Sequence, residues 1–567
     1  MPDRAAEGLP YGERAIALAS ESRLANQLWK AQLTVGAVQL ALGKFSEARA
    51  QFEAAINTVE LLRKNAAGGL RALQLLMTER LGPYYSLASL DIRDGRAFEA
   101  LASVDRARAR ALTSLLSSSH APSDRLSAPD RAEERRLTRA VQAASDALDA
   151  EAAKAGAEAG RIAALDAALA TARNRREEFL EALYSRQPAL KFARGNVPEL
   201  TPAQLASTLT PGSAIVSFVL DEHRAWGFLI ANGPSGPTVR PDPLTLSSDE
   251  LSALADTFAG QIASRDLAFA PTARKLYDAL LAPIESSLTK TTSLVIIPDG
   301  PLWRVPFQAL RTPRNTFVIE ERAVSYTASV AALAALESRR RARPAAAPFL
   351  LALGDPAGPA SVAGANGEQP QRGLTLARLP EAAREVKSIG QLYGANSRVL
   401  TDTLATETAL RELASRASVL HIATHGFLEN GNPMYSRLQL APSTDRSADH
   451  TGDGRLEAWE VQDLELRADI AVLSACRSAG GTGFGEGVIG LSWSLFAAGA
   501  STAVVSQWEV DSASTTSLMI AFHQRLLQRG APVTAATAMR DAQRTLLKNP
   551  QFRHPFYWAG FDVIGAR

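Results

Sequence analysis

The chain has 567 residues, too many for one hydrophobic core, so several domains are expected. Its composition, 46% hydrophobic and 21% charged, is that of a globular protein, and a net charge of +2 provides no field that attracts nucleic acid or an acidic membrane. One cysteine excludes an intramolecular disulfide, and the lack of about 18 consecutive apolar residues excludes a transmembrane helix. With no secretory signal at its start, the protein is expected to be cytoplasmic.

Residues 1–118 are predicted to be helical repeats, because one spacing of small and bulky residues occurs twice. The two copies are Gly36, Ala48, Phe52 and Ala55, then Ala88, Ala100, Val104 and Ala107, with Gly43 and Gly95 at the turns. Small residues let antiparallel helices approach closely, and a larger residue fills the gap between them. The pattern resembles tetratricopeptide repeats, with copies farther apart than the usual ~34 residues. A generic helical bundle is the alternative, and a helix beginning as early as Tyr11 is compatible with a piece of a longer protein.

Residues 119–195 are predicted to form a linker followed by an antiparallel helical hairpin. The linker is rich in Ser, Pro and Asp, and Gly156 and Gly160 mark a turn between two charged, Ala-rich helices. Each helix carries one apolar seam, formed by Leu137, Val141, Ala144 and Leu148 and by Ile162, Leu165 and Leu169. We interpret the hairpin as a strut between the repeats and the rest of the chain.

Two α/β segments are expected after the hairpin, over residues 196–346 and 347–567. Strands are predicted in the first at 214–220, 225–231, 293–297 and 317–326, with a boundary at 337–347. The second begins with a strand at 349–355 and continues with a helix from Pro380. Its later strands are predicted at 419–424, 470–475, 502–506 and near Tyr557, with helices from Ala513 and Pro532. The fold class is therefore multidomain, all-α followed by α/β.

Two of these strands end on reactive side chains. The apolar run 419–424 leads to His425, and the run 470–475 leads to Cys476, the only cysteine. In open α/β sheets, reactive groups gather at the carboxyl ends of parallel strands. A cysteine with a histidine about 50 residues upstream is also the caspase arrangement of a thiol nucleophile and its base. The pattern predicts a Cys/His pair, although a free cysteine is often only a small buried hydrophobe.

His425 can remove the thiol proton and later protonate the leaving amine. The backbone N–H groups of Gly426 and Cys476 can stabilise an oxyanion, each typically contributing ~2.7–4 kcal/mol in the transition state. The sequence indicates no third member of the catalytic group. A dinucleotide fingerprint at 485–490 is disfavoured because it lies well past the strand end.

Other candidates are weighed against structural roles. His421 is interpreted as a core histidine that has its hydrogen-bond partners. Asp445, Asp449, His450 and Asp453 are interpreted as a solvated loop rather than a metal site. Asp511 either caps the helix that follows it or forms the floor of a pocket for a cationic side chain.

The α/β part resembles the CHAT proteases, caspase-like domains that are related to separase and occur with tetratricopeptide repeats. The resemblance covers about 197–567. It rests on Ile296-Ile297-Pro298-Asp299-Gly300, Leu302, Pro306-Phe307, Leu379-Pro380, Glu385-Val386, His421-Ile422-Ala423-Thr424-His425-Gly426, Leu473-Ser474-Ala475-Cys476, Gly485-Glu486-Gly487, Ala498-Gly499-Ala500, Trp508 and Trp558-Ala559.

This resemblance implies a caspase-like cysteine endopeptidase with nucleophile Cys476, acid/base His425 and an oxyanion hole at Gly426 and Cys476. It also implies that 196–346 is a degenerate half and 347–567 the catalytic half. In the separase-like branch an acidic residue after the tryptophan strand receives a basic P1 side chain, and Asp511 falls near that place. Trp508 and Glu486 are further candidates for substrate binding.

The caspase signature Q-A-C-x-G is absent, so a preference for Asp is not transferred. We expect a protein substrate, a protein partner on the repeats, no cofactor and no metal, with a role in bacterial defence or signalling. The alternative is a catalytically silent scaffold for protein–protein interaction.

Overall fold

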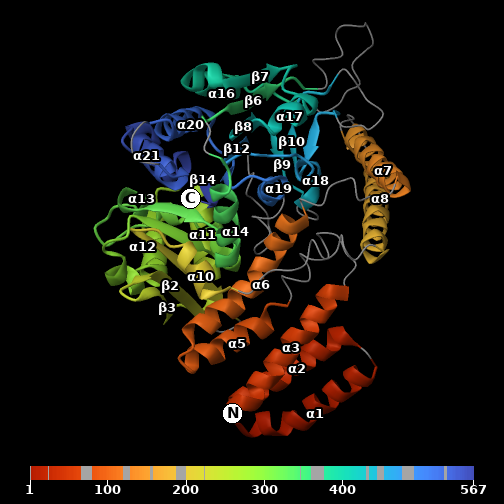
Figure 1. Ribbon diagram of the computed structural model, residues 1–567, viewed down its shortest axis with the longest axis vertical. Helices are drawn as coiled ribbons and strands as arrows, with labels where there is room; N and C mark the ends of the chain where they lie inside the picture. The colour runs from red at the N-terminus through yellow and green to blue at the C-terminus, as the bar shows by residue number, and fades with distance from the viewer. Residues whose placement is uncertain are drawn as a thin grey trace.

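The computed structural model describes residues 2–22, 24–65, 80–118, 128–152, 158–186, 200–221, 224–344, 347–358, 376–429, 433–443, 452–475, 491–528 and 533–566. Within them, helices occupy the N-terminal part, and a large mixed sheet covered by helices follows (Figure 1). The predicted fold class, an all-α part followed by an α/β part, is confirmed. No helix of the described segments is long and apolar enough to cross a membrane.

The repeat prediction agrees with how the first helices pack. They are α1 (Pro2–Glu21), α2 (Ala25–Ala41), α3 (Phe45–Asn65), α5 (Gly82–Arg93) and α6 (Ala97–Ser118). The turn glycines Gly43 and Gly95 have φ values of +74° and +73°, a conformation that favours glycine. At Gly36 an added Cβ would lie 2.5 Å from the ring of Phe52, so the missing side chain lets α3 approach α2.

The helical hairpin is present and packs against the second α/β segment. It consists of α7 (Ala128–Ala152) and α8 (Ala159–Arg186). Its seam residues Val141 and Leu169 form a small apolar cluster with Tyr435, and the Arg176 guanidinium lies 4.8 Å from the ring centre of Trp459. The hairpin is therefore attached to the chain around Tyr435 and Trp459 by apolar and cation–π contacts. The predicted turn glycine Gly156 lies outside the described residues, whereas Gly160 belongs to the first turn of α8.

One sheet of 11 strands runs through both α/β segments in the order β3-β2-β1-β4-β5-β14-β13-β12-β8-β6-β7. Its strands are β1 (Ser213–Leu220), β2 (Ala225–Gly233), β3 (Gly236–Pro243), β4 (Ser293–Ile297), β5 (Ala323–Tyr326), β6 (Leu350–Pro356), β7 (Ser397–Asp402), β8 (Val419–Thr424), β12 (Ile470–Ala475), β13 (Thr502–Ser506) and β14 (Phe561–Gly565). A three-stranded sheet is formed by β9 (Gly426–Phe427), β10 (Arg437–Gln439) and β11 (Arg455–Glu457).

The last strand joins the two segments. β14 pairs antiparallel with β13 and parallel with β5. Its Asp562 is buried and accepts hydrogen bonds from Gln308 and Gln507, one from each segment. Burial raises the pKa of Asp562 to about 7, even though the two amide donors act to lower it. The expected boundary at 337–347 thus separates two parts of one continuous sheet.

Both faces of the sheet are covered by helices. One face carries α11 (Ser248–Ala263), α12 (Phe269–Leu280), α16 (Pro380–Tyr393), α20 (Ser512–Leu526) and α21 (Ala535–Leu547). The other carries α6, α10 (Pro202–Ser207), α14 (Val330–Arg341), α18 (Ala458–Val461) and α19 (Leu491–Ala498), and α17 (Glu407–Ala414) follows β7. Along β1, Val216 packs with the first set, whereas Ile215 packs with the repeat helices. Helix α6 is thus part of the sheet's own hydrophobic core.

Three sequence predictions need correction. Residues 318–321 form the short helix α13 (Val318–Glu321) rather than a strand, because the Glu320 carboxylate accepts a 2.7 Å hydrogen bond from the Phe317 N–H and favours a helical turn there. The expected boundary from residue 337 lies partly in α14, where Glu337 pairs with Arg340 and Arg341 one turn later. The last strand begins at Phe561, after a short 3-10 turn that contains Tyr557.

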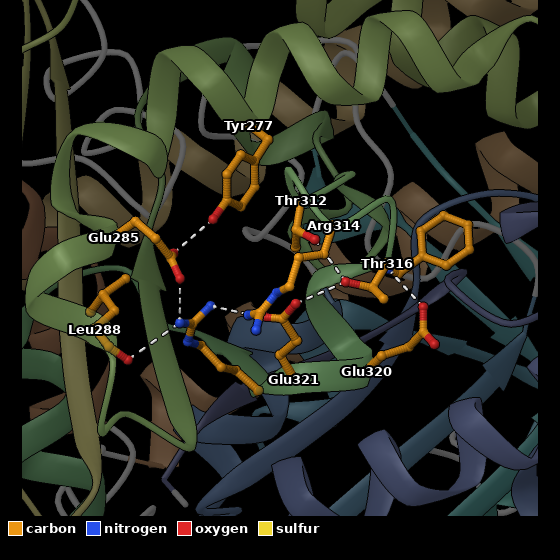
Figure 2. A network of polar contacts seen from close by, with 10 residues as sticks. Tyr277, Glu285, Leu288, Thr312, Arg314, Thr316, Glu320 and Glu321 are labelled. Atoms are coloured by element: carbon orange, nitrogen blue, oxygen red, sulfur yellow. Dashed lines mark hydrogen bonds and ion pairs between the residues drawn. The ribbon is translucent and has the colours of Figure 1, made fainter.

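The first α/β segment contains a polar network that serves its own packing (Figure 2). The buried Arg322 guanidinium donates to Glu285 at 2.7 Å and to the Leu288 carbonyl at 3.3 Å. Glu285 also accepts from the Tyr277 hydroxyl at 2.7 Å, and Glu321 joins Arg322 to Arg314 and Thr316. Because these contacts tie the turn around α13 to the chain before β4, we assign the network a structural role.

Helix α6 is fixed to the sheet by a buried ion pair. Arg108 lies 2.9 Å from Asp299, which follows β4, and donates to the Phe218 carbonyl at 2.5 Å. Asp299 also accepts from the Tyr85 hydroxyl at 3.0 Å and from the Leu220 N–H at 2.7 Å. Both charged side chains are about nine-tenths buried, with 9% and 11% of their surface exposed. Removing one partner would leave the other as an uncompensated buried charge.

We therefore expect Arg108→Met to destabilise the fold by about 3–5 kcal/mol, because the Asp299 carboxylate keeps its burial and loses its cation. The midpoint of urea unfolding measures the effect. Arg136→Ala is the matched control, since Arg136 forms an exposed pair with Glu133 and its loss should leave the midpoint unchanged. Equal midpoints for Arg108→Met and the unmutated protein would contradict a stabilising role for this ion pair.

Candidate functional site

The carboxyl ends of three parallel strands lie side by side in the second α/β segment. β12 pairs with β8, with Ala475 opposite Thr424, and β8 pairs with β6, with Ala423 opposite Gly354. His425 directly follows β8, and Asp355 belongs to the end of β6. Cys476 follows Ala475 in the sequence but lies outside the described residues, as does Glu486. The predicted pairing of Cys476 with His425 remains a prediction.

The imidazole of His425 is held by a backbone carbonyl. Its Nε2 lies 2.8 Å from the carbonyl oxygen of Ala377, in the non-helical segment before α16. Because a carbonyl oxygen only accepts hydrogen bonds, Nε2 carries the proton, and Nδ1 of the neutral ring is the acceptor. The arrangement leaves Nδ1 with the lone pair that a general base needs. The sequence did not indicate Ala377, since a backbone carbonyl has no side-chain signature.

The N–H of Gly426 points away from its neighbouring strand. Gly426 lies in β9 opposite Leu438 of β10, and the Gln439 N–H donates to the His425 carbonyl at 2.9 Å. In an antiparallel ladder, hydrogen-bonded and non-hydrogen-bonded pairs alternate. Gly426 therefore occupies a non-hydrogen-bonded position, which directs its N–H away from β10. This geometry is compatible with the predicted role in an oxyanion hole.

Asp355 is the charged group next to His425. Its side chain is 7% exposed and receives hydrogen bonds from the Arg378 guanidinium and the Leu379 N–H. Burial acts to raise the pKa of Asp355, but the hydrogen bonds from Arg378 and Leu379, with the charges of Arg378 and His425, hold it below its usual value. Asp355 is therefore a carboxylate at neutral pH.

His421 is a core histidine with hydrogen-bond partners, as the sequence analysis predicted. It is fully buried, with Nε2 at 2.7 Å from Glu385 and Nδ1 at 3.1 Å from Nε2 of His523. His523 Nδ1 in turn lies 3.0 Å from the Tyr393 hydroxyl. Burial, and then the neighbouring His421, holds the pKa of His523 well below its usual value. The chain of contacts ties β8 to α16 and α20.

The predicted substrate-binding residues have structural contacts of their own. Asp511 is the N-cap of α20 and accepts a hydrogen bond from the Ser514 N–H at 2.9 Å. This agrees with helix capping, the first of its two sequence interpretations. Trp508 is mostly buried, and its indole N–H donates to the Phe556 carbonyl at 3.2 Å. Whether either side chain contacts a substrate is left as a prediction.

The acidic loop before β11 is described only at its end. Asp445, Asp449 and His450 lie outside the described residues. Asp453 accepts a hydrogen bond from the Arg455 N–H at 2.7 Å. Burial, followed by the charge of Asp453, raises the pKa of the neighbouring Glu407 to about 8. Asp453 thus acts on the buried carboxyl group of Glu407, and the interpretation of the whole loop as solvated stays a prediction.

Comparison with known proteins gives one family match and several distant similarities. The CHAT domain matches residues 270–566. Tetratricopeptide repeat protein 28 of Homo sapiens and that of Mus musculus are each 26% identical over 336 residues, 52% of this chain and 13% of theirs. This chain thus spans a small part of those relatives.

Two solved structures are similar at low sequence identity. The Saccharomyces cerevisiae separase–securin complex has a TM-score of 0.42 and 8% identity, covering 100% of this chain and 53% of that chain. The complex of Porphyromonas gingivalis RgpB pro- and mature domains has a TM-score of 0.33 and 11% identity, covering 56% and 75%. At TM-scores below 0.5, these similarities are too low for a comparison of sites.

The buried histidine pair leads to a pH prediction. Since the pKa of His523 is lowered in the folded protein, the unfolded chain binds a proton below about pH 6.5 that the folded chain excludes. The contribution of His523 to the free energy of unfolding is therefore fully present above about pH 6.5 and is lost as the pH falls below it. We expect the thermal midpoint to fall more steeply from pH 7 to pH 5 in the unmutated protein than in His523→Gln, which retains a donor and an acceptor. Equal slopes of thermal midpoint against pH in the two proteins would contradict this expectation.

Proposed function

The chain belongs to the CHAT-domain family, and from that premise we propose that it is a cysteine endopeptidase with Cys476 as nucleophile and His425 as general base. The observation that carries the proposal is the register of β8 and β12, in which Thr424 lies opposite Ala475. His425 and Cys476 are the next residues of the two strands. Because consecutive Cα atoms are about 3.8 Å apart, the proposal places the two side chains at the same edge of the sheet.

The reaction follows from the groups at this edge. Nδ1 of His425 takes the thiol proton, and the thiolate attacks the carbonyl carbon of the scissile peptide bond. The oxygen becomes an oxyanion that accepts a hydrogen bond from the Gly426 N–H. The imidazolium then returns its proton to the leaving amine as the C–N bond breaks. A water molecule, deprotonated by His425, finally hydrolyses the thioester and restores the thiol.

The repeats are proposed to receive the protein partner that controls this activity. Their last helix, α6, packs against both α14 and α19. Asp105 of α6 accepts hydrogen bonds from the N–H groups of Val330 and Ala331 at the start of α14. Helix α19 begins at Leu491 and is the first described helix after Cys476 in the sequence. A partner that moves α6 therefore acts directly on the helix that follows the nucleophile.

The rival function is a catalytically silent scaffold, and substitution of the two reactive residues separates the alternatives. We expect Cys476→Ala and His425→Ala each to abolish cleavage of a fluorogenic peptide library and of a denatured protein substrate. The thermal midpoint should stay within a few degrees, because a small thiol contributes little packing and His425 is partly exposed. Cleavage by Cys476→Ala at the unmutated rate would remove Cys476 from the mechanism. A complete lack of cleavage by the unmutated chain, with and without a repeat-binding partner, would favour the scaffold.

We further propose that Asp511 selects a basic P1 residue, with Trp508 and Glu486 lining the same groove. A carboxylate in a pocket must be paired with a cation, and an arginine fork satisfies both of its oxygens. The variant Asp511→Asn is a matched test, because its side-chain oxygen still caps α20 while the charge is lost.

With this variant, kcat/KM for a peptide with Arg at P1 should fall by roughly 10²-fold or more, as expected when a ~2–5 kcal/mol charge pair is broken. A peptide with Leu at P1 should be unaffected. A library profile of the unmutated protein that favours Leu, Met or Asp would limit Asp511 to its capping role.

A further inference from the structure

The carbonyl that orients His425 belongs to a short segment, residues 376–379, which we name the strap. The strap has no regular secondary structure and precedes Pro380, the first residue of α16. Its Ala377 carbonyl accepts the hydrogen bond from His425 Nε2. Because Ala377 is exposed, burial of its own side chain does not hold this carbonyl in one orientation. Other contacts must therefore fix it.

The next residue along the strap, Arg378, is held by two carboxylates. Its Nε and Nη2 donate to the two oxygens of Asp355 at 3.0 and 2.8 Å, the bidentate geometry for which arginine is suited. Its Nη1 lies 3.1 Å from Asp402 at the end of β7. Asp355 Oδ1 also accepts from the Leu379 N–H at 2.7 Å. The residues on the carboxyl side of Ala377 are thus tied to the ends of two strands.

The two aspartates hold unusual backbone conformations. Asp355 has a φ of +46° and Asp402 a φ of +57°, in the left-handed region that non-glycine residues seldom adopt. Near them the pairing of β6 with β7 shifts register between Gly354 and Pro356. Backbone strain of this kind persists where surrounding contacts over-determine it, and it clusters at functional sites. The contacts around the two aspartates include those with Arg378 and, at Asp355, the hydrogen bond from the Leu379 N–H.

Helix α16, which begins directly after the strap, is itself held against the sheet. At Gly354, an added Cβ would lie 2.8 Å from the Ala382 carbonyl oxygen of α16, so the helix backbone rests directly on β6. One helical turn later, Glu385 is bonded to His421 on β8, the strand that ends at His425. The carboxyl side of the strap is therefore tied to the sheet twice, through Arg378 and Leu379 and through α16.

From these contacts we infer that Arg378 and Asp355 are positioning residues for His425, acting through the Ala377 carbonyl that their bridge holds in place. The inference rests on the proposed function, because it assigns the bridge to the orientation of the proposed general base. Without the bridge the strap turns, the carbonyl leaves Nε2, and the imidazole populates the other tautomer or rotates. Nδ1 is then no longer reliably available to the thiol.

The bridge acts by geometry rather than by its charge. The Asp355 carboxylate interacts with the charge of His425, and the paired Arg378 guanidinium opposes that interaction with a charge of opposite sign. Asp402 is half exposed, and water screens its charge. The expected consequence is a lower rate of the chemical step at unchanged substrate binding. Arg378 is itself half exposed, so a direct contact with substrate is the alternative, and that contact would act on KM.

The test uses the full chain with Arg378→Gln and with the conservative Arg378→Lys. We expect kcat to fall about 10²-fold in Arg378→Gln, the size of effect that misplacement of a reacting group by about 1 Å produces, while KM changes by less than about twofold. Arg378→Lys should retain part of kcat, because lysine keeps the charge but not the two-pronged contact. Arg384→Gln is the control, because Arg384 and Glu381 form an exposed ion pair on α16. This variant should behave as the unmutated protein does.

A second readout is independent of peptidase activity. With ¹⁵N-labelled histidine rings, and the His425 signal assigned from its loss in His425→Ala, the unmutated protein should show a single tautomer protonated at Nε2. Arg378→Gln should show a mixture. An unchanged tautomer in Arg378→Gln, or a loss of kcat/KM that lies in KM, would overturn the positioning role. If the unmutated protein cleaves nothing, the proposed function fails, and the tautomer measurement still decides whether the bridge positions His425.

Discussion

The site depends on the matched registers of three parallel strands. Since β8 pairs in continuous register with β6 on one side and with β12 on the other, the carboxyl ends of the three strands lie at one edge of the sheet. A shift of one residue in any strand would turn its side chains to the opposite face. Because each strand packs against helices on both faces, such a shift would disrupt the packing of the core on both sides of the sheet. Helices on both faces thus enforce the position of His425.

Register alone does not orient an imidazole ring. That orientation comes from polar contacts that cross between elements: the Ala377 carbonyl on Nε2, and the Asp355–Arg378 bridge beside it. The buried Arg108–Asp299 pair has a similar role at another strand end, where it fixes α6 to the residues that follow β4. In each case a charged group at a strand end holds a segment that is distant in the sequence. The last repeat helix, α6, is consequently fixed to the α/β part.

The sequence predicted the features that depend on short-range patterns. Gly43 and Gly95 were found as turns, Pro380 as a helix start and His421 as a core residue, because each follows from the conformation or chemistry of a few neighbours. Features set by distant contacts were missed. The insertion of β14 between β5 and β13 depends on pairings that no local pattern encodes. The Ala377 carbonyl lacks a side chain that would mark it, and the Tyr435 contact of the hairpin joins segments far apart.

The central claim, that His425 activates Cys476, is tested most directly by the reactivity of the thiol. The chain has one cysteine, so iodoacetamide consumption at neutral pH reports Cys476 alone. Because the thiolate is the reactive form and a neighbouring histidine increases its population, the unmutated protein should be alkylated about tenfold faster than His425→Ala. Equal alkylation rates in the two proteins, with the fold of both intact, would contradict the account.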